Sequence, residues 1–293
     1  EIYEQCKLWQ VSPLRERIGG LEPRAIPLDT ARRLKVGYVS GDFRHHAAAY
    51  WIEPLLTGHQ HNDFCVYCYS NGDQTDAVTN RLKTYADVWV ECASMVDDAL
   101  YERIRQDGID ILVDLSGHTG GNRLAVFARK PAAVQVSWFG FPVSTGLRAM
   151  DYRFSDHYID PEGQVEQYYS EQLIRLTRFY AAFRPEVSAP EVGTCPFLRN
   201  GFVTFASLNS LAKITPSMQS IWADILCAQP DSRLLIQAAG LEDVEQRKRV
   251  LNYFHAQGVA LERLTLRGWT TIDEFLLLGQ EADIALDPFP FNG

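Results

Sequence analysis

Three side chains follow candidate strands at places where a ligand could reach them. His46 ends the loop after the first such strand, and a group that titrates near neutrality suits proton transfer. His118 lies in the glycine-rich loop 116–121, where the backbone can approach a ligand closely. Lys213 stands just before a helix start, where its ammonium could meet a phosphate favoured by the helix dipole. Each has a plainer interpretation, because loop histidines and lysines are usually solvated and glycines also make turns.

The elements that would position these side chains alternate along the chain. Short apolar runs are separated by helical patterns from about residue 33 onward. The candidate strands are 34–40, 64–70, 88–92, 109–115, 134–139, 202–208, 233–238, 264–267 and 282–286. This alternation is the signature of βαβ units and predicts an α/β protein with parallel sheets.

Capping signals predict the ends of several helices. Asp97 is a candidate N-cap for a helix over 97–106 that stops at Gly108. Thr215 and Pro216 are typical of the N-cap and first residue of a helix. Lys213 would therefore lie close to the positive end of a helix.

Two more helices are expected in the second half of the chain. One covers 241–257, and a capping box over 271–274 opens the other. The helix that begins at residue 216 carries an apolar stripe, which we predict to be core rather than a cofactor surface: Met218, Ile221, Trp222, Ile225 and Leu226.

Prolines mark a junction between two domains. They stand at 161, 185, 190 and 196, in a segment with little sustained periodicity. We therefore divide the chain into a leader over 1–32, a first Rossmann-like lobe over 33–185 and a second over 186–293. Neither lobe carries GxGxxG after its first strand and no GxxxxGK[ST] is present, which disfavours a nicotinamide or flavin dehydrogenase and an NTPase.

Composition narrows the class of partner and the compartment. The formal net charge of -9 gives no general attraction for nucleic acid or anionic lipid, so a phosphate must be held by local groups. Six scattered cysteines favour free thiols in a reducing, cytoplasmic compartment. Cys65 and Cys68 form a CxxC, but within a predicted strand that sends them to opposite faces, which favours packing thiols over a metal site.

Several segments together resemble one family. They are KVGYVSGDFRHH at 35–46, DGIDILVDLSGHT at 107–119, MDY at 150–152, NSLAKITP at 209–216 and ADIALDP at 282–288. In this order they are similar to the O-GlcNAc transferase and SPINDLY-type family of protein glycosyltransferases, in a bacterial form. The resemblance covers about residues 33 to 293.

The resemblance implies a fold, a reaction and roles for individual residues. The fold is glycosyltransferase type B, and the reaction is inverting, metal-independent transfer of N-acetylglucosamine from UDP-GlcNAc to Ser or Thr hydroxyls of proteins, with no further cofactor. His46 matches the histidine proposed as base or acceptor-site residue, and Lys213 matches the lysine that holds the donor diphosphate. Asn209, Ser210 and His118 are expected to line the donor site, with Ser210 standing where some members carry an amide.

The resemblance also bears on the two ends of the chain. It implies a tetratricopeptide-repeat region upstream, with residues 1–32 as a linker or its trailing edge. Family members continue after the final Asn-Gly with a Thr-containing turn and a helix that bind the donor. We therefore expect the second lobe to be incomplete and the chain by itself not to complete the transfer.

Three other functions stay open from the sequence. One is a related transferase that uses UDP-glucose or GDP-fucose, or that modifies asparagine. Another is a non-catalytic module that binds protein partners, and the third is a two-lobed sugar-nucleotide epimerase. Donor titration and mapping of the modified residue would separate the related transferases from transfer of N-acetylglucosamine to Ser or Thr.

Overall fold

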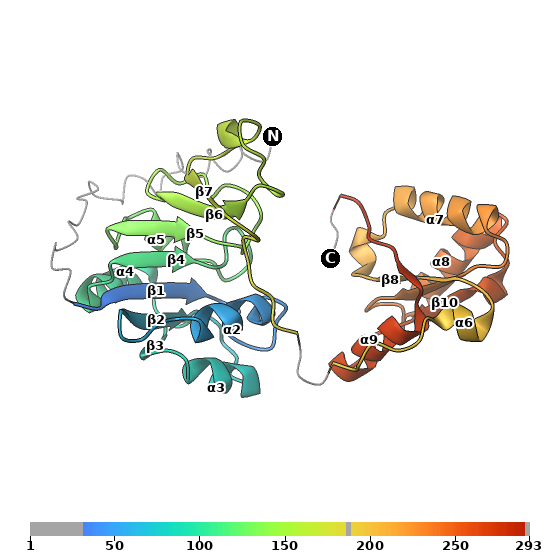
Figure 1. The fold of residues 1–293 in the computed structure, drawn as a ribbon, viewed down its shortest axis with the longest axis horizontal. Coiled ribbons are helices and arrows are strands. Elements are labelled where there is room, and N and C mark those ends of the chain that lie inside the picture. Colours follow the sequence, from blue (N-terminus) through green and yellow to red (C-terminus); the bar gives the residue numbers. More distant parts are fainter. Residues whose placement is uncertain (1–31, 186–188, 291–293) are drawn as a thin grey trace. The chain divides into compact units, whose positions relative to one another are not determined.

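The computed structural model describes residues 32–185 and 189–290. The chain divides into two compact units, Glu1–Pro185 and Glu186–Gly293, and each is an α/β structure (Figure 1).

The described part of the first unit contains one parallel sheet of seven strands in the order β3-β2-β1-β4-β5-β6-β7. The strands are β1 (Leu34–Ser40), β2 (Phe64–Ser70), β3 (Val88–Glu91), β4 (Ile111–Asp114), β5 (Val134–Ser137), β6 (Tyr152–Asp156) and β7 (Gln172–Leu176). The predicted ranges of β1 and β2 are confirmed, and β3, β4 and β5 are each shorter than predicted by one to three residues.

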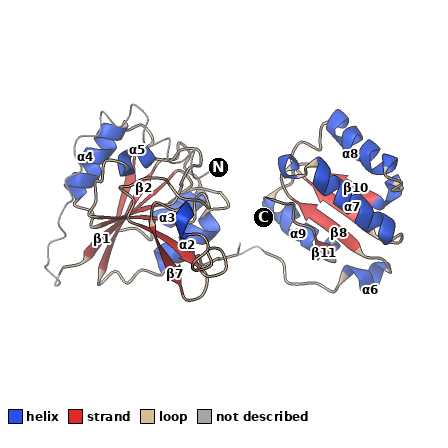
Figure 2. Cartoon of the chain, turned by 90° about the horizontal axis from the view of Figure 1, so that it is seen from above, coloured by secondary structure: helices blue, strands red, loops and turns tan. Residues whose placement is uncertain are grey.

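Helices cover both faces of this sheet, which gives three layers (Figure 2). The helices are α2 (Ala49–Thr57), α3 (Ala77–Lys83), α4 (Asp97–Asp107), α5 (Leu124–Phe127) and the 3-10 turn η2 (Glu166–Tyr168). Buried side chains of α4 and α5 join one core, and those of α2 and α3 join the other. The sheet is therefore apolar on both faces, as parallel strands require.

The CxxC lies in β2 as predicted. Cys68 is fully buried in the core with α2 and α3, whereas Cys65 packs against the core with α4 and α5. Both are free thiols. Their side chains point to opposite faces of the sheet, so they cannot form one metal site.

For α4, the predicted carboxyl-terminal stop is confirmed and the predicted N-cap is wrong. Gly108 closes the helix in the left-handed conformation with φ of 70°, which confirms the predicted stop. The prediction that Asp97 is the N-cap is wrong, because Val96 holds that position without a side-chain cap. The Asp97 carboxylate accepts instead from Arg123 Nη1 at 2.7 Å.

Strands β6 and β7 were not predicted. Strand β6 contains three buried polar side chains, Arg153, Ser155 and Asp156, which hide the apolar pattern of a strand. Strand β7 falls in the segment that the prolines marked as a junction, and its side chains are mostly half-buried.

The described part of the second unit contains four parallel strands in the order β10-β9-β8-β11. They are β8 (Thr204–Leu208), β9 (Arg233–Gln237), β10 (Leu264–Arg267) and β11 (Ile284–Ala285). The helices are α6 (Pro196–Asn200), α7 (Pro216–Ala228), α8 (Val244–Ala256) and α9 (Ile272–Leu278), with 3-10 turns η3 (Leu211–Lys213), η4 (Leu261–Arg263) and η5 (Gly279–Glu281). The predicted range of β10 is confirmed, and the other three strands are shorter than predicted.

The apolar stripe of α7 is core, with one exception. Met218, Trp222 and Leu226 are buried together with side chains of α8, and Ile225 packs against them. Ile221 is 48 % exposed, so its place in the predicted core is wrong. It lies off the face that Met218, Trp222 and Leu226 share at i, i+4 and i+8.

Two capping predictions in this unit are confirmed. Thr215 caps α7 by accepting from the Met218 amide, and Pro216 follows at the first helical position. Thr271 and Glu274 form the capping box of α9. Across the described ranges, the structure contains no helix of the length and apolar character that a membrane span requires.

Candidate active site

The first unit places its candidate residues at the switch point of its sheet. Strand β1 lies between β2 and β4, so the chain leaves β1 toward one edge and returns to continue toward the other. Ligands of open α/β sheets bind beyond the carboxyl ends of the strands at such a point. The loop 41–46 follows β1 and the loop 116–121 follows β4, so both border this point.

These loops are in contact. A Cβ atom on Gly41 would lie 3.5 Å from the Gly121 carbonyl oxygen. Asn71, which follows β2, donates from Nδ2 to the same oxygen at 2.5 Å, and its own Oδ1 accepts from Arg123 Nε at 2.8 Å. Arg123 also binds Asp97 and the Cys92 carbonyl. Hydrogen bonds thus connect the loops after β2, β3 and β4, and the His45 amide, which donates to Asp76 Oδ2 at 2.7 Å, connects the loop after β1 to the one after β2.

His46 lies three residues before the start of α2, with 42 % of its side chain exposed. Its Nδ1 accepts from the Ala48 amide at 3.2 Å, and Asp42 Oδ1 is 3.8 Å from the same nitrogen. The Ala48 contact is the true hydrogen bond, because 3.8 Å is too long for one. The rest of the ring is open to a ligand.

Helix α2 is fixed by the end of the first unit. The Phe183 ring lies 5.0 Å from that of Trp51, and the Arg184 amide donates to the Tyr50 carbonyl at 2.9 Å. Because His46 leads directly into α2, these contacts restrain the base of its loop.

His118 is half-buried in the loop after β4. Its Nε2 lies 3.2 Å from the Ser144 carbonyl oxygen, and its ring meets Phe141 edge-on at 6.2 Å. Gly117 takes φ of +58°, and a Cβ there would come within 2.8 Å of the Phe141 nitrogen. The position before His118 therefore requires glycine.

Asp114, the last residue of β4, shapes this turn. Its carboxylate is fully buried and accepts from the Ser116 amide at 3.1 Å and the Gly117 amide at 2.9 Å. Burial raises the pKa of Asp114 to about 6, although these two bonds and the charge of Arg153 act in the opposite direction. Carboxyl groups with perturbed pKa values are common at functional sites.

The second unit has the same arrangement. Strand β8 lies between β9 and β11, so its switch point lies between β8 and β11. Asn209 and Ser210 follow β8, and Asn209 Nδ2 is 3.5 Å from Asp287 Oδ1 in the loop after β11. That loop also contacts the start of α7, because the Phe289 amide donates to the Met218 sulfur at 3.1 Å.

Lys213 ends the turn η3 and lies two residues before the N-cap of α7. Its amide donates to the Ser210 carbonyl at 2.9 Å, and its carbonyl accepts from the Thr215 amide at 3.0 Å. Its side chain is half-buried beside the positive end of α7. The structure thus brings Asn209, Ser210 and Lys213 together, whereas His46 and His118 lie in the other unit.

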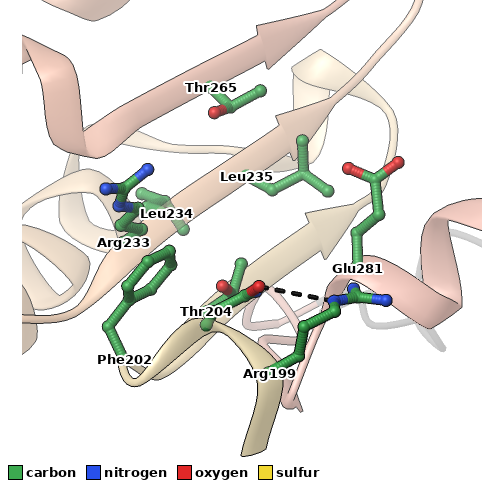
Figure 3. A pocket seen from close by; sticks show the side chains of 9 residues that line it. Arg199, Phe202, Thr204, Arg233, Leu234, Leu235, Thr265 and Glu281 are labelled. Atoms are coloured by element: carbon green, nitrogen blue, oxygen red, sulfur yellow. Dashed lines mark hydrogen bonds between the residues drawn. The ribbon is translucent and has the colours of Figure 1, made fainter. Parts of the chain in front are cut away.

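The second unit also contains a cavity of about 290 Å³ at the amino ends of its strands, away from the switch point. Its lining residues are Arg199, Asn200, Phe202, Thr204, Arg233, Leu234, Leu235, Thr265 and Glu281, which start or precede the strands (Figure 3). Arg233 stacks on Phe202 at 3.9 Å, while Arg199 lies on the other side. The two guanidinium groups do not converge, and Lys213 does not line this cavity.

Sequence reasoning missed the buried residues that support the site. Asp114 had a readable signal, since an aspartate at a strand end before Ser-Gly can accept backbone amides. Ser144, and Glu171, whose carboxylate accepts from Ser144 Oγ at 2.6 Å, had none. Among the described residues no cluster of three or more His, Cys, Asp or Glu side chains has metal-binding geometry.

Two Rossmann-like units in succession, each with polar residues at its switch point, match the predicted glycosyltransferase type B fold, and comparisons with known proteins agree with it. Residues 23–183, more than half of the chain, match the family described as Glycosyl transferase family 41. The chain belongs to this family.

Individual proteins agree with this assignment. The chain is 37 % identical over 270 residues to the probable UDP-N-acetylglucosamine–peptide N-acetylglucosaminyltransferase SPINDLY of Petunia hybrida, and to that of Arabidopsis thaliana. Each match covers 90 % of this chain and 29 % of the relative. A mutant O-GlcNAc transferase from Thermobaculum terrenum has 39 % identity and a TM-score of 0.89, over 99 % of this chain and 55 % of that one. The chain thus spans only part of the length of these relatives.

Proposed function

We propose that this protein transfers N-acetylglucosamine from UDP-GlcNAc to Ser or Thr hydroxyls of proteins, with inversion and without a metal ion. One observation carries the proposal. In a chain of glycosyl transferase family 41, the histidines of one unit and the lysine of the other lie at the switch points of their sheets. The names of the Petunia and Arabidopsis relatives contain the same donor and a peptide acceptor.

Lys213 has the main electrostatic role on the donor side. As the glycosidic bond breaks, negative charge grows on the UDP leaving group, and a fixed cation stabilises this state more than the ground state. The amino-terminal end of α7 has few free backbone N–H groups to offer the phosphates, because Pro216 has no N–H and the Met218 amide donates to Thr215. Asn209 and Ser210 would hold other polar atoms of the donor.

His46 acts on the acceptor side. A hydroxyl that attacks the anomeric carbon opposite the UDP inverts that centre in one displacement and must lose its proton. His46 either accepts this proton or orients the hydroxyl while solvent accepts it. To accept it at Nε2, the ring must carry its hydrogen on Nδ1, where Asp42 at 3.8 Å could then replace the Ala48 contact.

The partners follow from this chemistry. They are a nucleotide-sugar donor and a protein or peptide acceptor, the latter brought by an upstream tetratricopeptide-repeat region. A cytoplasmic location is part of the proposal, and the free thiols of the five cysteines within the described ranges support it.

The test is a transfer assay with the full-length protein. UDP-GlcNAc, UDP-glucose and GDP-fucose are each supplied with peptides that differ only in Ser, Thr or Asn, and mass spectrometry identifies product and site. We expect hexosamine on Ser or Thr from UDP-GlcNAc, undiminished by EDTA and strongly reduced in His46→Ala and Lys213→Ala. Transfer from another donor, onto asparagine, or only with added metal would contradict the proposal.

A further inference from the structure

The contact between His118 and Ser144 determines what the imidazole can offer a ligand. A carbonyl oxygen only accepts hydrogen bonds, so Nε2 must carry the hydrogen in the 3.2 Å contact with the Ser144 oxygen. In the neutral ring this leaves Nδ1 with a lone pair. No group in residues 32–185 or 189–290 forms a hydrogen bond with that nitrogen.

Glu171 holds the Ser144 carbonyl in place. Its carboxylate is 6 % exposed and accepts from Ser144 Oγ at 2.6 Å, from the Thr145 amide at 2.6 Å and from the Thr145 hydroxyl. Ser144 Oγ also accepts from the Gly146 amide at 3.0 Å. Glu171 immediately precedes β7, so the edge of the sheet fixes the loop that meets His118.

The other side of the ring is fixed independently. Asp114 binds the amides of Ser116 and Gly117, and Gly117 packs on Phe141 with no room for a Cβ. The Phe141 ring lies at 87° to the His118 ring. The imidazole therefore has both its position and its hydrogen assigned by buried neighbours, as second-layer partners do for catalytic and metal-binding histidines.

We propose that His118 accepts, through Nδ1, a hydrogen bond from a substrate O–H or N–H, and that Glu171 is the positioning residue that sets this tautomer through Ser144. The ligand half of the inference rests on the proposed function. The shared chemistry is a hydrogen-bond donor, which either a sugar hydroxyl or a peptide amide can supply. A purely structural Glu171 would anchor the loop without any effect on the imidazole.

The tautomer can be measured without any turnover. Long-range ¹H–¹⁵N spectra of the full-length protein labelled in histidine, at about pH 8, where an ordinary imidazole is neutral, distinguish the two neutral forms. The signals of His118 are assigned with His118→Asn. We expect the Nε2–H form in the unaltered protein. In Glu171→Gln we expect a mixture of both forms, because the side-chain amide has one accepting oxygen and can accept either from Ser144 or from Thr145, but not from both. Ser144→Ala, which keeps the carbonyl, serves if Glu171→Gln does not fold, and should shift the equilibrium less. An Nδ1–H form in the unaltered protein, or unchanged spectra in the folded variants, would overturn the inference.

Kinetics identify the source of the hydrogen bond. His118→Ala should raise one KM roughly five- to tenfold, the effect of one hydrogen bond, with kcat less affected. A change in the KM for nucleotide sugar assigns the sugar hydroxyl, and a change in the KM for peptide assigns the peptide amide. His118→Asn, which can present an oxygen near the place of Nδ1, should recover part of the loss. Unchanged values of both KM overturn the ligand half of the inference. Absence of transfer by the unaltered protein also overturns it, because that result contradicts the proposed function. The spectra decide the tautomer in either case.

Discussion

The buried carboxylate of Asp114 leads to a prediction about stability and pH. Asp114→Asn removes the negative charge of the carboxylate that accepts from the Ser116 and Gly117 amides. The asparagine oxygen can accept one of these amides, but its NH₂ group faces the other. This mismatch costs about 1–3 kcal/mol at every pH.

The ionisation of Asp114 adds a cost that depends on pH. Burial raises its pKa from the ordinary 3.8 to about 6, so between these values the folded state binds more protons than the unfolded state. The free energy of unfolding therefore falls as pH rises through this window. The shift in the pKa of Asp114 corresponds to about 3 kcal/mol of the free energy of unfolding. This contribution is fully present below about pH 4 and is lost above about pH 7. Asp114→Asn lacks this dependence, so its disadvantage relative to the unaltered protein should shrink or reverse toward neutral pH.

Urea unfolding of both proteins at a series of pH values measures this difference, since contributions from other groups cancel. Asp156→Asn is the matched control. Burial alone would raise the pKa of Asp156, but backbone amides of Ile159, Tyr180 and Tyr158 hold it below its usual range. Its stabilisation is lost as pH falls, so the control must show the opposite slope. A difference for Asp114→Asn that is flat from pH 4 to 7, or slopes like the control, would contradict a raised pKa for Asp114.

Two further predictions concern the loops at the switch point of the first unit. Gly117→Ala should destabilise the protein by more than about 1–2 kcal/mol, because it adds a left-handed non-glycine residue and a clash with Phe141, and thermal unfolding measures this. Gly120→Ala is its control and should be nearly neutral, since a Cβ there meets nothing within 4 Å. Arg123→Ala should lower the free energy of unfolding by about 2 kcal/mol and speed amide hydrogen exchange in the loops after β2 and β4, because it removes the hydrogen bond to Asn71. Unchanged exchange in these loops would contradict that role.

The sequence predicted those parts of the fold that depend on local patterns. Strands β1, β2 and β10 have their predicted bounds because apolar runs are flanked by polar loops. The caps of α7 and α9 were predictable because the capping residues lie within three positions of their partners.

The misses come from contacts between distant residues. Asp97 looked like an N-cap, but Arg123, distant in sequence, takes its carboxylate. Strand β6 looked polar because its buried Arg153 and Asp156 find partners elsewhere: Arg153 binds Ser137, and Asp156 accepts the Tyr180 amide. Local propensity cannot register such partners.

The candidate site divides in the same way. The positions of His46, His118 and Lys213 after strands were readable, because the carboxyl ends of parallel strands share one edge. The support of His118 by Ser144 and Glu171 was not readable, since it joins loops separated by strands β5 and β6.

Calorimetric titration of UDP and UDP-GlcNAc into the full-length protein tests whether Lys213 holds the diphosphate of a nucleotide sugar. Lys248→Ala is the control, since it removes an exposed lysine of α8 that pairs only with Glu245 among the described residues. We expect both ligands to bind the unaltered protein and the control alike, and to bind Lys213→Ala more than tenfold more weakly, as loss of a charged hydrogen bond predicts. Equal affinity for the folded Lys213→Ala variant, or no binding by the unaltered protein, would contradict the role of Lys213 in holding the diphosphate.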